Sequence, residues 1–349
     1  MTSFESGYLD RVRFSSDHVA TLRALGQYRG RQDLYRKQAP ELLAALREAA
    51  VIESSESSNR IEGITAPRDR IEALILKPTA PRDRSEEEIA GYRDALNLIH
   101  ESATEMAFSA NVILQLHGML YRYHAGVGGK WKTAPNEIVE RNPDGSLRRV
   151  RFVPVPPVAT PNFMERLGVE YARAHDLQRE PLVLVPLAIL DFLCVHPFAD
   201  GNGRMARLLT LLLLYQAGYE VGRYISLERI VEESKETYYE ALEASSQGWH
   251  DGKHDALPWM TYLWGVLLRA YGEFEERVGT IRTGRGAKTD LIEQAVARRT
   301  RPFGITEIEA ECPGVSRDMV RHVLQRLRDE GKLTVQGTGR GARWAPQNQ

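Results

Sequence analysis

Apolar residues recur along most of the chain at the three- and four-residue spacing of helix faces. This spacing predicts helices over residues 40–52, 85–100, 110–123, 162–173, 226–244 and 258–276. Residues 1–40 show only short helical patterns with polar breaks. Two further segments, residues 181–194 and 204–218, are apolar on nearly every side, which predicts a pair of buried central helices. We therefore expect a mainly α-helical protein.

The helical pattern is interrupted once in the first 278 residues. Within residues 129–155, two short β-like runs flank the turn Asn142-Pro143-Asp144-Gly145, which predicts a β-hairpin. A lone two-stranded hairpin is marginally stable in water. We therefore expect the helices to hold it in place or the hairpin to serve as a flap. Farther along, the glycine-rich residues 279–286 predict a linker.

The remaining residues, 287–349, have the pattern of a small separate domain. Their order is a helix over 289–299, a short second helix with a capping box at Thr306, a third helix capped by Ser316, and two strand-like runs. A helix, a helix-turn-helix and a hairpin resemble a winged helix. Pro313 and Gly314 are expected to form the turn between the second and third helices.

The charge of this tail does not decide what it binds. From residue 285 on, 12 Lys and Arg stand against 8 Asp and Glu. The arginines expected on the third helix and in the hairpin are Arg317, Arg321, Arg328, Arg340 and Arg343. This excess fits a DNA-binding surface. It fits equally a protein-docking module or a solvated face.

The composition of the whole chain is that of an ordinary soluble protein. It has 349 residues, of which 42% are hydrophobic and 27% charged, and a net charge of -1. That balance predicts two or three domains and no overall attraction to nucleic acid or membrane. Cys194 and Cys312 are too far apart in sequence to suggest a disulfide framework, and no signal peptide or membrane span is visible. We expect a cytoplasmic protein.

One stretch, residues 196–207, departs from what packing alone requires. Gly201 and Gly203 flank Asn202, so the backbone can turn with positive φ angles and direct successive N–H groups into one concavity. A helix expected to begin near Arg204 adds its positive N-terminal end. Arg204 and Arg207 lie three positions apart, so both can face the same site. The stretch predicts a site for polyphosphate.

Two further residues suggest chemistry at that site. A carboxylate beside bound phosphate requires a bridging cation, so Asp200 predicts Mg²⁺. His196 is a candidate general base for an incoming hydroxyl. Taken singly, a glycine pair is usually a turn and a histidine at a helix end is usually a packed or capping residue. The combination within twelve residues favours the functional interpretation.

The same stretch resembles the signature of the Fic family, His-Pro-Phe-x-Asp/Glu-Gly-Asn-Gly-Arg-x-x-Arg, without a gap. The resemblance covers about residues 1–275. It implies a Fic-type helical core that transfers AMP from Mg·ATP to a Ser, Thr or Tyr hydroxyl of a protein. It also implies His196 as the base, Asp200 as the Mg²⁺ ligand, and ATP contacts from Gly201, Asn202, Gly203, Arg204, Arg207, Tyr238 and Tyr239. The hairpin resembles the family's flap, with Ile138 and Val139 facing the target.

The serine-rich residues 53–63 end like a helix, because Gly63 is a typical residue after a helix C-terminus. On its own this segment fits an exposed helix end. Ser58-x-x-x-Glu62-Gly63 is, however, similar to the family's inhibitory motif. The likeness implies that Glu62 pairs with Arg207 in place of the γ-phosphate, and some such proteins also remove AMP.

These inferences give three expected regions: 1–110 with the inhibitory helix, 111–278 with the catalytic core and flap, and 287–349 with the winged helix. The expected partners are ATP, a protein substrate, and DNA or protein at the winged helix, with a homodimer left open. The alternative function is a DNA-binding regulator whose Fic core senses nucleotide. The intact His196 favours the enzyme, because a sensor needs no base.

Overall fold

The computed structural model describes residues 3–5, 7–38, 40–77, 79–124, 126–141, 144, 146–278, 287–297, 299, 302–312, 315–337 and 342–346. The chain is mainly helical, as predicted. It divides into two compact units, residues 1–32 with 45–274 and residues 33–44 with 275–349. Among the described residues, no helix has both the length and the apolar character needed to cross a membrane.

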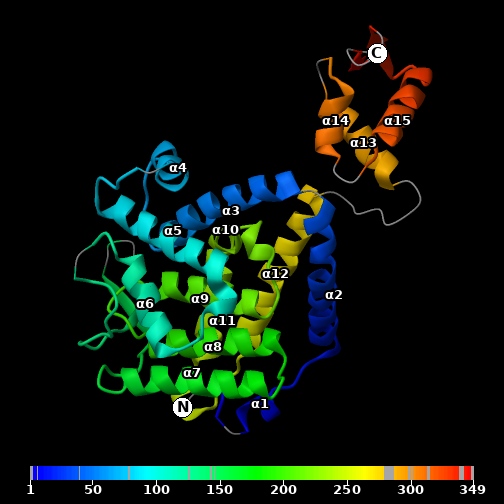
Figure 1. Cartoon of the computed structure of the whole chain (residues 1–349). Coiled ribbons are helices and arrows are strands. Elements are labelled where there is room, and N and C mark those ends of the chain that lie inside the picture. Colours follow the sequence, from blue (N-terminus) through cyan, green and yellow to red (C-terminus); the bar gives the residue numbers. More distant parts are fainter. Residues whose placement is uncertain are drawn as a thin grey trace. The chain divides into compact units, whose positions relative to one another are not determined.

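Figure 1 follows the helices in chain order. They are α1 (Tyr8–Arg11), α2 (Ser16–Gln38), α3 (Pro40–Ile61), α4 (Arg68–Leu76), α5 (Arg84–Ser102), α6 (Ala110–Leu120), α7 (Thr160–Asp176), α8 (Pro181–Val195), α9 (Asn202–Gln216), α10 (Leu227–Glu233), α11 (Lys235–Ser246) and α12 (Leu257–Val278). Over residues 1–40, the short α1 and the break after it fit the interrupted pattern expected there, whereas the long continuous α2 does not.

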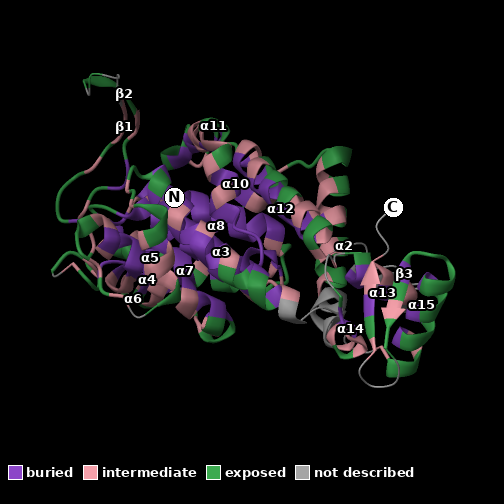
Figure 2. Ribbon diagram, turned by 90° about the horizontal axis from the view of Figure 1, so that it is seen from above, coloured by how far each residue is buried: buried purple, intermediate pink, exposed green. Residues whose placement is uncertain are grey.

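The core of the larger unit is built around α8 and α9. Every residue from Leu182 to Val195 on α8 is buried, and α8 packs against both α7 and α9. Figure 2 shows this concentration of buried residues around α8. The two helices predicted from all-round apolarity are thus the central ones. The loop between them carries the candidate site, so that loop is fixed at both ends by buried helices.

A proline inside α8 is accommodated by a tryptophan of α12. Pro186 has no N–H, so it cannot pair with the carbonyl of Leu182 one turn earlier. Trp264 Nε1 donates to that Leu182 carbonyl at 2.7 Å instead. In the same way, Trp259 Nε1 donates to the Pro186 carbonyl at 2.8 Å. Two indoles therefore satisfy buried backbone acceptors and fix α12 against α8.

Two helix boundaries differ from the predictions. α5 begins at Arg84, one residue earlier than expected, and its N-cap is Asp83, whose Oδ1 accepts from the Glu86 N–H at 3.0 Å. The single helix predicted over residues 226–244 is two helices, α10 and α11, which are separated at Ser234. The break at Ser234 allows α11 to turn toward the candidate site.

The serine-rich part of α3 is buried, contrary to its interpretation as an exposed helix end. The residues there that are less than 5% exposed are Ser54, Ser55, Ser57, Ser58 and Asn59. Small side chains let neighbouring helices approach closely, and some of their hydroxyls have buried partners, although Ser55 Oγ has none. Ser54 Oγ, for example, donates to Glu228 Oε2 at 2.7 Å. Polarity therefore marks an inter-helix contact here rather than solvent exposure.

The expected hairpin is present as β1 (Ile138–Arg141) and β2 (Leu147–Phe152). The strands are antiparallel, with Ile138 opposite Phe152 and an irregular register between them. Ion pairs hold the hairpin to α11, since Arg149 contacts Glu243 at 2.5 Å. Of the predicted turn, Asn142, Pro143 and Gly145 lie outside the described residues.

The smaller unit contains α13 (Ala287–Ala297), α14 (Ile305–Glu311), α15 (Arg317–Asp329), β3 (Leu333–Gln336) and β4 (Arg343–Pro346). β3 and β4 pair antiparallel, and Phe303 forms a bridge with Trp344. The N-cap of α14 is Gly304, not Thr306. The winged-helix assignment itself stays a prediction. The predicted linker 279–286, the Pro313-Gly314 turn and Arg340 lie outside the described residues.

The tail arginines that the structure describes are paired with acids. The pairs are Arg317–Glu309, Arg321–Asp318, Arg328–Asp329 and Arg343–Glu307, at 2.7–3.2 Å. Local pairing reduces the field that a phosphate backbone would meet. These pairs join exposed side chains, where an ion pair contributes little, so the DNA-binding interpretation stays a prediction.

The Pro186–Trp264 arrangement gives a stability prediction. Trp264→Phe removes the donor to the buried Leu182 carbonyl, and we expect the free energy of unfolding to fall by about 2–4 kcal/mol. In a Pro186→Ala background, the N–H of residue 186 can pair with that carbonyl. In that background, Trp264→Phe should lower the free energy of unfolding by about 1 kcal/mol less, as measured by urea unfolding.

The matched control is Trp249→Phe, because Trp249 Nε1 donates to Asp191 at 2.6 Å and not to a carbonyl near Pro186. Its cost should be the same in both backgrounds. Equal costs of Trp264→Phe in the two backgrounds would contradict the compensation.

Candidate active site

The loop between α8 and α9 ends in a helix N-terminus that is open to ligands. α9 begins at Asn202, two residues earlier than predicted, and its N-cap Gly201 has φ of 81°. The first helical bond runs from the Met205 N–H to the Gly201 carbonyl at 2.9 Å. The N–H groups of residues 202–204 therefore precede the helical ladder. Together with the helix dipole they form a site suited to an anion.

The loop is held from inside by Asn202. The Phe198 N–H donates to Asn202 Oδ1 at 2.9 Å, and Asn202 Nδ2 donates to the Phe198 carbonyl at 2.8 Å. Phe198 is fully buried. The Asn202 side chain is therefore committed to the loop, and only its backbone N–H is available to a ligand.

His117 on α6 also holds the loop, which the sequence did not reveal. Its ring stacks on Phe198 with centroids 3.6 Å apart. The Gly129 N–H donates to His117 Nδ1 at 3.0 Å, so Nε2 carries the proton and donates to the Asp200 carbonyl at 3.1 Å. Burial lowers the pKa of His117 to about 4, so the ring is neutral near pH 7 and can keep this tautomer.

The C-terminal end of α8 is capped by two residues just before the hairpin. Lys132 Nζ donates to the Val195 carbonyl at 3.0 Å. Asn136 Nδ2 lies 3.3 Å from the carbonyl of the C-cap His196 and donates to the Phe198 carbonyl in the loop at 3.0 Å. A cation is favourable at the negative end of a helix. The only sequence signal for these contacts is a polar run after glycines, which does not identify a partner.

His196 has the geometry of a neutral general base. It is the C-cap of α8 with φ of 49°, a left-handed conformation that is uncommon for a residue with a side chain. A carbonyl can only accept, so His196 Nδ1 donates to the Leu193 carbonyl at 3.2 Å. Nε2 is then left unprotonated. Burial lowers the pKa of His196 to about 4, so the ring is neutral near pH 7.

Arg207 brings α9 into contact with the end of α3. Arg207 Nη2 lies 2.8 Å from Glu62 Oε1. Its Nε donates to Ser58 Oγ and its Nη2 to the Ser58 carbonyl, both at 2.8 Å. The guanidinium is only 6% exposed. The residues of the predicted inhibitory motif therefore lie on this arginine.

The remaining space around Arg207 is suited to a further anion. Its Nη1 is buried and has no hydrogen-bond partner. A Cβ on Gly203 would lie 3.3 Å from that atom and 2.2 Å from Glu62 Oε1. Glu62 therefore lies directly over the glycine loop. An anion at this position, from Glu62 or from a ligand, needs glycine at residue 203.

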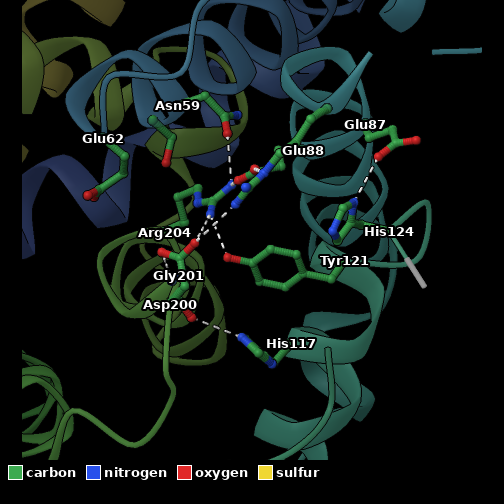
Figure 3. Close-up of polar contacts among 12 residues, drawn as sticks. Asn59, Glu62, Glu87, Glu88, His117, Tyr121, His124, Asp200, Gly201 and Arg204 are labelled. Atoms are coloured by element: carbon green, nitrogen blue, oxygen red, sulfur yellow. Dashed lines mark hydrogen bonds and ion pairs between the residues drawn. The ribbon is translucent and has the colours of Figure 1, made fainter. Parts of the chain in front are cut away.

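Arg204 is placed differently from the prediction that it faces the same site as Arg207. It is 1% exposed, and its Nη1 lies 2.6 Å from Glu88 Oε2 on α5. Its Nη2 donates to the Tyr121 hydroxyl at 2.7 Å, and Nη1 to Asn59 Oδ1 at 3.3 Å (Figure 3). Three positions turn a helix by about 300°, which leaves about 60° between the two side chains. Arg204 supports the loop from beneath.

Asp200 has the exposure and position of a carboxylate at the rim. Its side chain is 58% exposed, and Oδ2 lies 4.0 Å from Arg204 Nη2. Among the residues that the structure describes, no group of three His, Cys, Asp or Glu side chains could hold a metal alone. A single carboxylate fits Mg²⁺ that arrives with a polyphosphate, because Mg²⁺ commonly combines one or two carboxylates with phosphate oxygens and water.

These residues surround one cavity of about 690 Å³. The predicted site residues that line it are Glu62, Ile138, Val139, His196, Asp200, Gly201, Asn202, Gly203, Arg207, Tyr238 and Tyr239. They come from α3, the hairpin, the α8–α9 loop, α9 and α11. Ser58 contacts Arg207, while Arg204 lies below the loop. The cavity combines a neutral base, an anion site and aromatic walls.

A comparison of sequences identifies the domain around this loop. Residues 107–214 match the sequence model of the Fic/DOC family. This segment is similar to the Fic/DOC domain. The Fic domain thus includes α6 to α9 and the hairpin, whereas α3 with Ser58 and Glu62 lies before it.

Solved structures show the same fold beyond the Fic domain. A Fic family protein from Desulfovibrio desulfuricans G20 is similar with a TM-score of 0.66 and 19% identity, over 97% of this chain and 98% of that one. Fic-1 from Caenorhabditis elegans is similar with a TM-score of 0.58 and 19% identity, over 76% and 73% of the two chains. At such identities the likeness concerns the fold alone.

Curated relatives match shorter segments. Protein adenylyltransferase Fic of Nematostella vectensis is 25% identical over 206 residues, which are 55% of this chain and 42% of that relative. Protein adenylyltransferase fic-1 of Caenorhabditis elegans is 25% identical over 164 residues, 46% of this chain and 29% of the relative. The chain spans less than half the length of either relative.

The environment of His196 gives a pH prediction. Burial disfavours the charged imidazolium, so we expect the ring to stay neutral from pH 8 down to about pH 5. NMR of the ¹⁵N-labelled chain would follow this titration, with the His196 signals assigned by their loss in His196→Asn. An inflection near the ordinary pKa of 6.5 would contradict the buried, neutral base.

Proposed function

We propose that this chain is a protein adenylyltransferase that Glu62 holds inactive. The observation that carries the proposal is one cavity containing a neutral His196, the open N-terminus of α9, and Arg207 paired with Glu62 at 2.8 Å. The match of residues 107–214 to the Fic/DOC family and the names of the curated relatives support AMP transfer as the reaction.

The reaction is a substitution at phosphorus. The hydroxyl oxygen of a Ser, Thr or Tyr in the target protein attacks the α-phosphorus of ATP. The bond from that phosphorus to the oxygen bridging it to the β-phosphate breaks, and pyrophosphate leaves. His196 Nε2 takes the hydroxyl proton, because Nδ1 is already protonated and bonded to Leu193. The AMP remains on the target oxygen as a phosphodiester.

The anion site on α9 would hold the phosphates. The N–H groups of residues 202–204 and the helix dipole stabilise negative charge that develops as the bond breaks. Asp200 would hold Mg²⁺, which neutralises phosphate charge when it is bound. Tyr238 and Tyr239 would form the nucleoside wall, because both line the cavity from α11.

The flap and the target fit together as strands. β1 and β2 form a two-stranded sheet that also lines the cavity through Ile138 and Val139. A two-stranded sheet has free edges, and an extended peptide can pair with one of them. A target segment added there would place its hydroxyl near His196.

Inhibition follows from the position of Glu62. Its carboxylate lies on Arg207 and over Gly203, where the terminal phosphate of ATP would otherwise bind. Like charges repel, so ATP must bind displaced while Glu62 is present. A displacement of the reacting atoms by ~1 Å can lower a rate by about 10²-fold. The same carboxylate could orient water, which keeps AMP removal as a second activity for assay.

The proposal predicts the behaviour of two variants. With ATP labelled at the α-phosphate, Glu62→Gly should label itself or lysate proteins at least about tenfold more than wild type, since the displacing anion is gone. Adding His196→Ala to Glu62→Gly should lower that labelling by about 10²-fold or more, since the base is lost.

The matched control is Glu105→Gly, which removes an exposed glutamate away from the cavity and should label like wild type. Labelling of Glu62→Gly no higher than wild type would contradict inhibition by Glu62. Undiminished labelling by the double variant would contradict the assignment of the base.

The DNA-binding regulator stays a second prediction without a favouring observation. The paired tail arginines do not strengthen it. Cytoplasmic location, a homodimer and a partner for the tail likewise stay predictions.

A further inference from the structure

The last turn of α3 is completed by side chains from other helices. Glu62 is the C-cap, and Gly63 has φ of 80°. The Gly63 N–H donates to the Arg60 carbonyl, and the Ile64 N–H to the Asn59 carbonyl, each at 3.0 Å. This pair of bonds is a Schellman motif, which ends a helix and satisfies two of its terminal carbonyls.

That motif leaves two carbonyls near the end of α3 without a backbone donor, and each accepts a hydrogen bond from one cationic side chain. The Ser58 carbonyl accepts from Arg207 Nη2 at 2.8 Å. The Ile61 carbonyl accepts from Lys235 Nζ at 2.8 Å. Lys235 is the first residue of α11, so it reaches α3 from the helix that carries the cavity tyrosines. A cation at a helix C-terminus is favoured by the helix dipole.

Lys235 contacts the backbone of the residue directly before Glu62. Ile61 directly precedes Glu62, so holding the Ile61 carbonyl fixes the backbone from which the Glu62 side chain extends. The side chain of Arg60, which precedes Ile61, is held less firmly. Arg60 pairs with Glu232 at 3.2 Å, but its side chain is 45% exposed, where an ion pair contributes little.

We infer that Lys235 is a positioning residue for self-inhibition: it clamps the C-terminus of α3 so that Glu62 stays on Arg207. This inference rests on the proposed function. It assigns Lys235 to the inhibited state and not to the transfer of AMP. Lys235 also lines the cavity, and its ammonium lies 6.0 Å from the centroid of the Tyr239 ring, but it donates its hydrogen bond to a backbone carbonyl of α3. Its loss should therefore loosen Glu62 and leave the anion site on α9 intact.

The test compares two backgrounds with ATP labelled at the α-phosphate. Lys235→Met should raise labelling by the full chain about three- to tenfold, the range of a helix-end charge contact. Lys235→Arg keeps a cation and should restore most of the inhibition. In the Glu62→Gly background, Lys235→Met should change labelling by less than about twofold, because the carboxylate that Lys235 positions is absent.

A second measurement is independent of activity. Hydrogen exchange of the amides in residues 58–64 should be faster in Lys235→Met than in wild type, because the last turn opens more often. Lys253→Met, which removes an exposed lysine in a loop, should match wild type in both measurements.

Unchanged exchange in residues 58–64 would overturn the clamp. Labelling by Lys235→Met equal to wild type, with an active Glu62→Gly, would also overturn it. A loss of labelling when Lys235→Met is added to Glu62→Gly would make Lys235 a nucleotide contact instead. If Glu62→Gly itself fails to label, the proposed function fails, and the exchange measurement still decides the clamp.

Discussion

The guanidinium of Arg207 is a permanent positive charge that is 6% exposed. Removing one partner of a buried ion pair costs about 3–5 kcal/mol, because the other charge is left without compensation. The Glu62 side chain is 31% exposed, so water screens part of this cost, but the end of the cavity around Arg207 still favours an anion. Glu62 supplies it in this structure, and under the proposed function a bound polyphosphate would supply it instead. In that proposal, the charge that suits the site to phosphate also holds the inhibitory carboxylate.

The contact of α3 with the core combines apolar packing, as at Ile52, with buried hydroxyls and charges around Ser54 and Ser58. Glu228 accepts from both Tyr92 and Ser54, and Ser58 accepts from Arg207. Buried hydrogen bonds lose their partners when a helix shifts. This polar contact sets one register for α3, and one register is needed for Glu62 to reach Arg207.

Local signals in the sequence predicted the helical class, the two central helices, the hairpin and the glycine loop between the central helices. The pairing of Glu62 with Arg207 followed from resemblance to a family motif. The residues that hold the loop could not be predicted from the sequence, because His117 and Lys132 are distant from the loop in sequence and contact it only in the folded structure. The direction of Arg204 was missed for the same reason. Its partner Glu88 lies on α5, and helical spacing alone does not identify which neighbour faces which side.

Glu62 lies directly after the last residue of α3, and that position limits how much of the helix must open to release it. Helix ends open locally while the rest of the helix stays folded. The smallest motion that clears Arg207 is thus an unwinding of the turn from Asn59 to Glu62, with the rest of α3 still docked. If Glu62 inhibits as proposed, a partner that holds that turn open therefore needs to contact only a few residues.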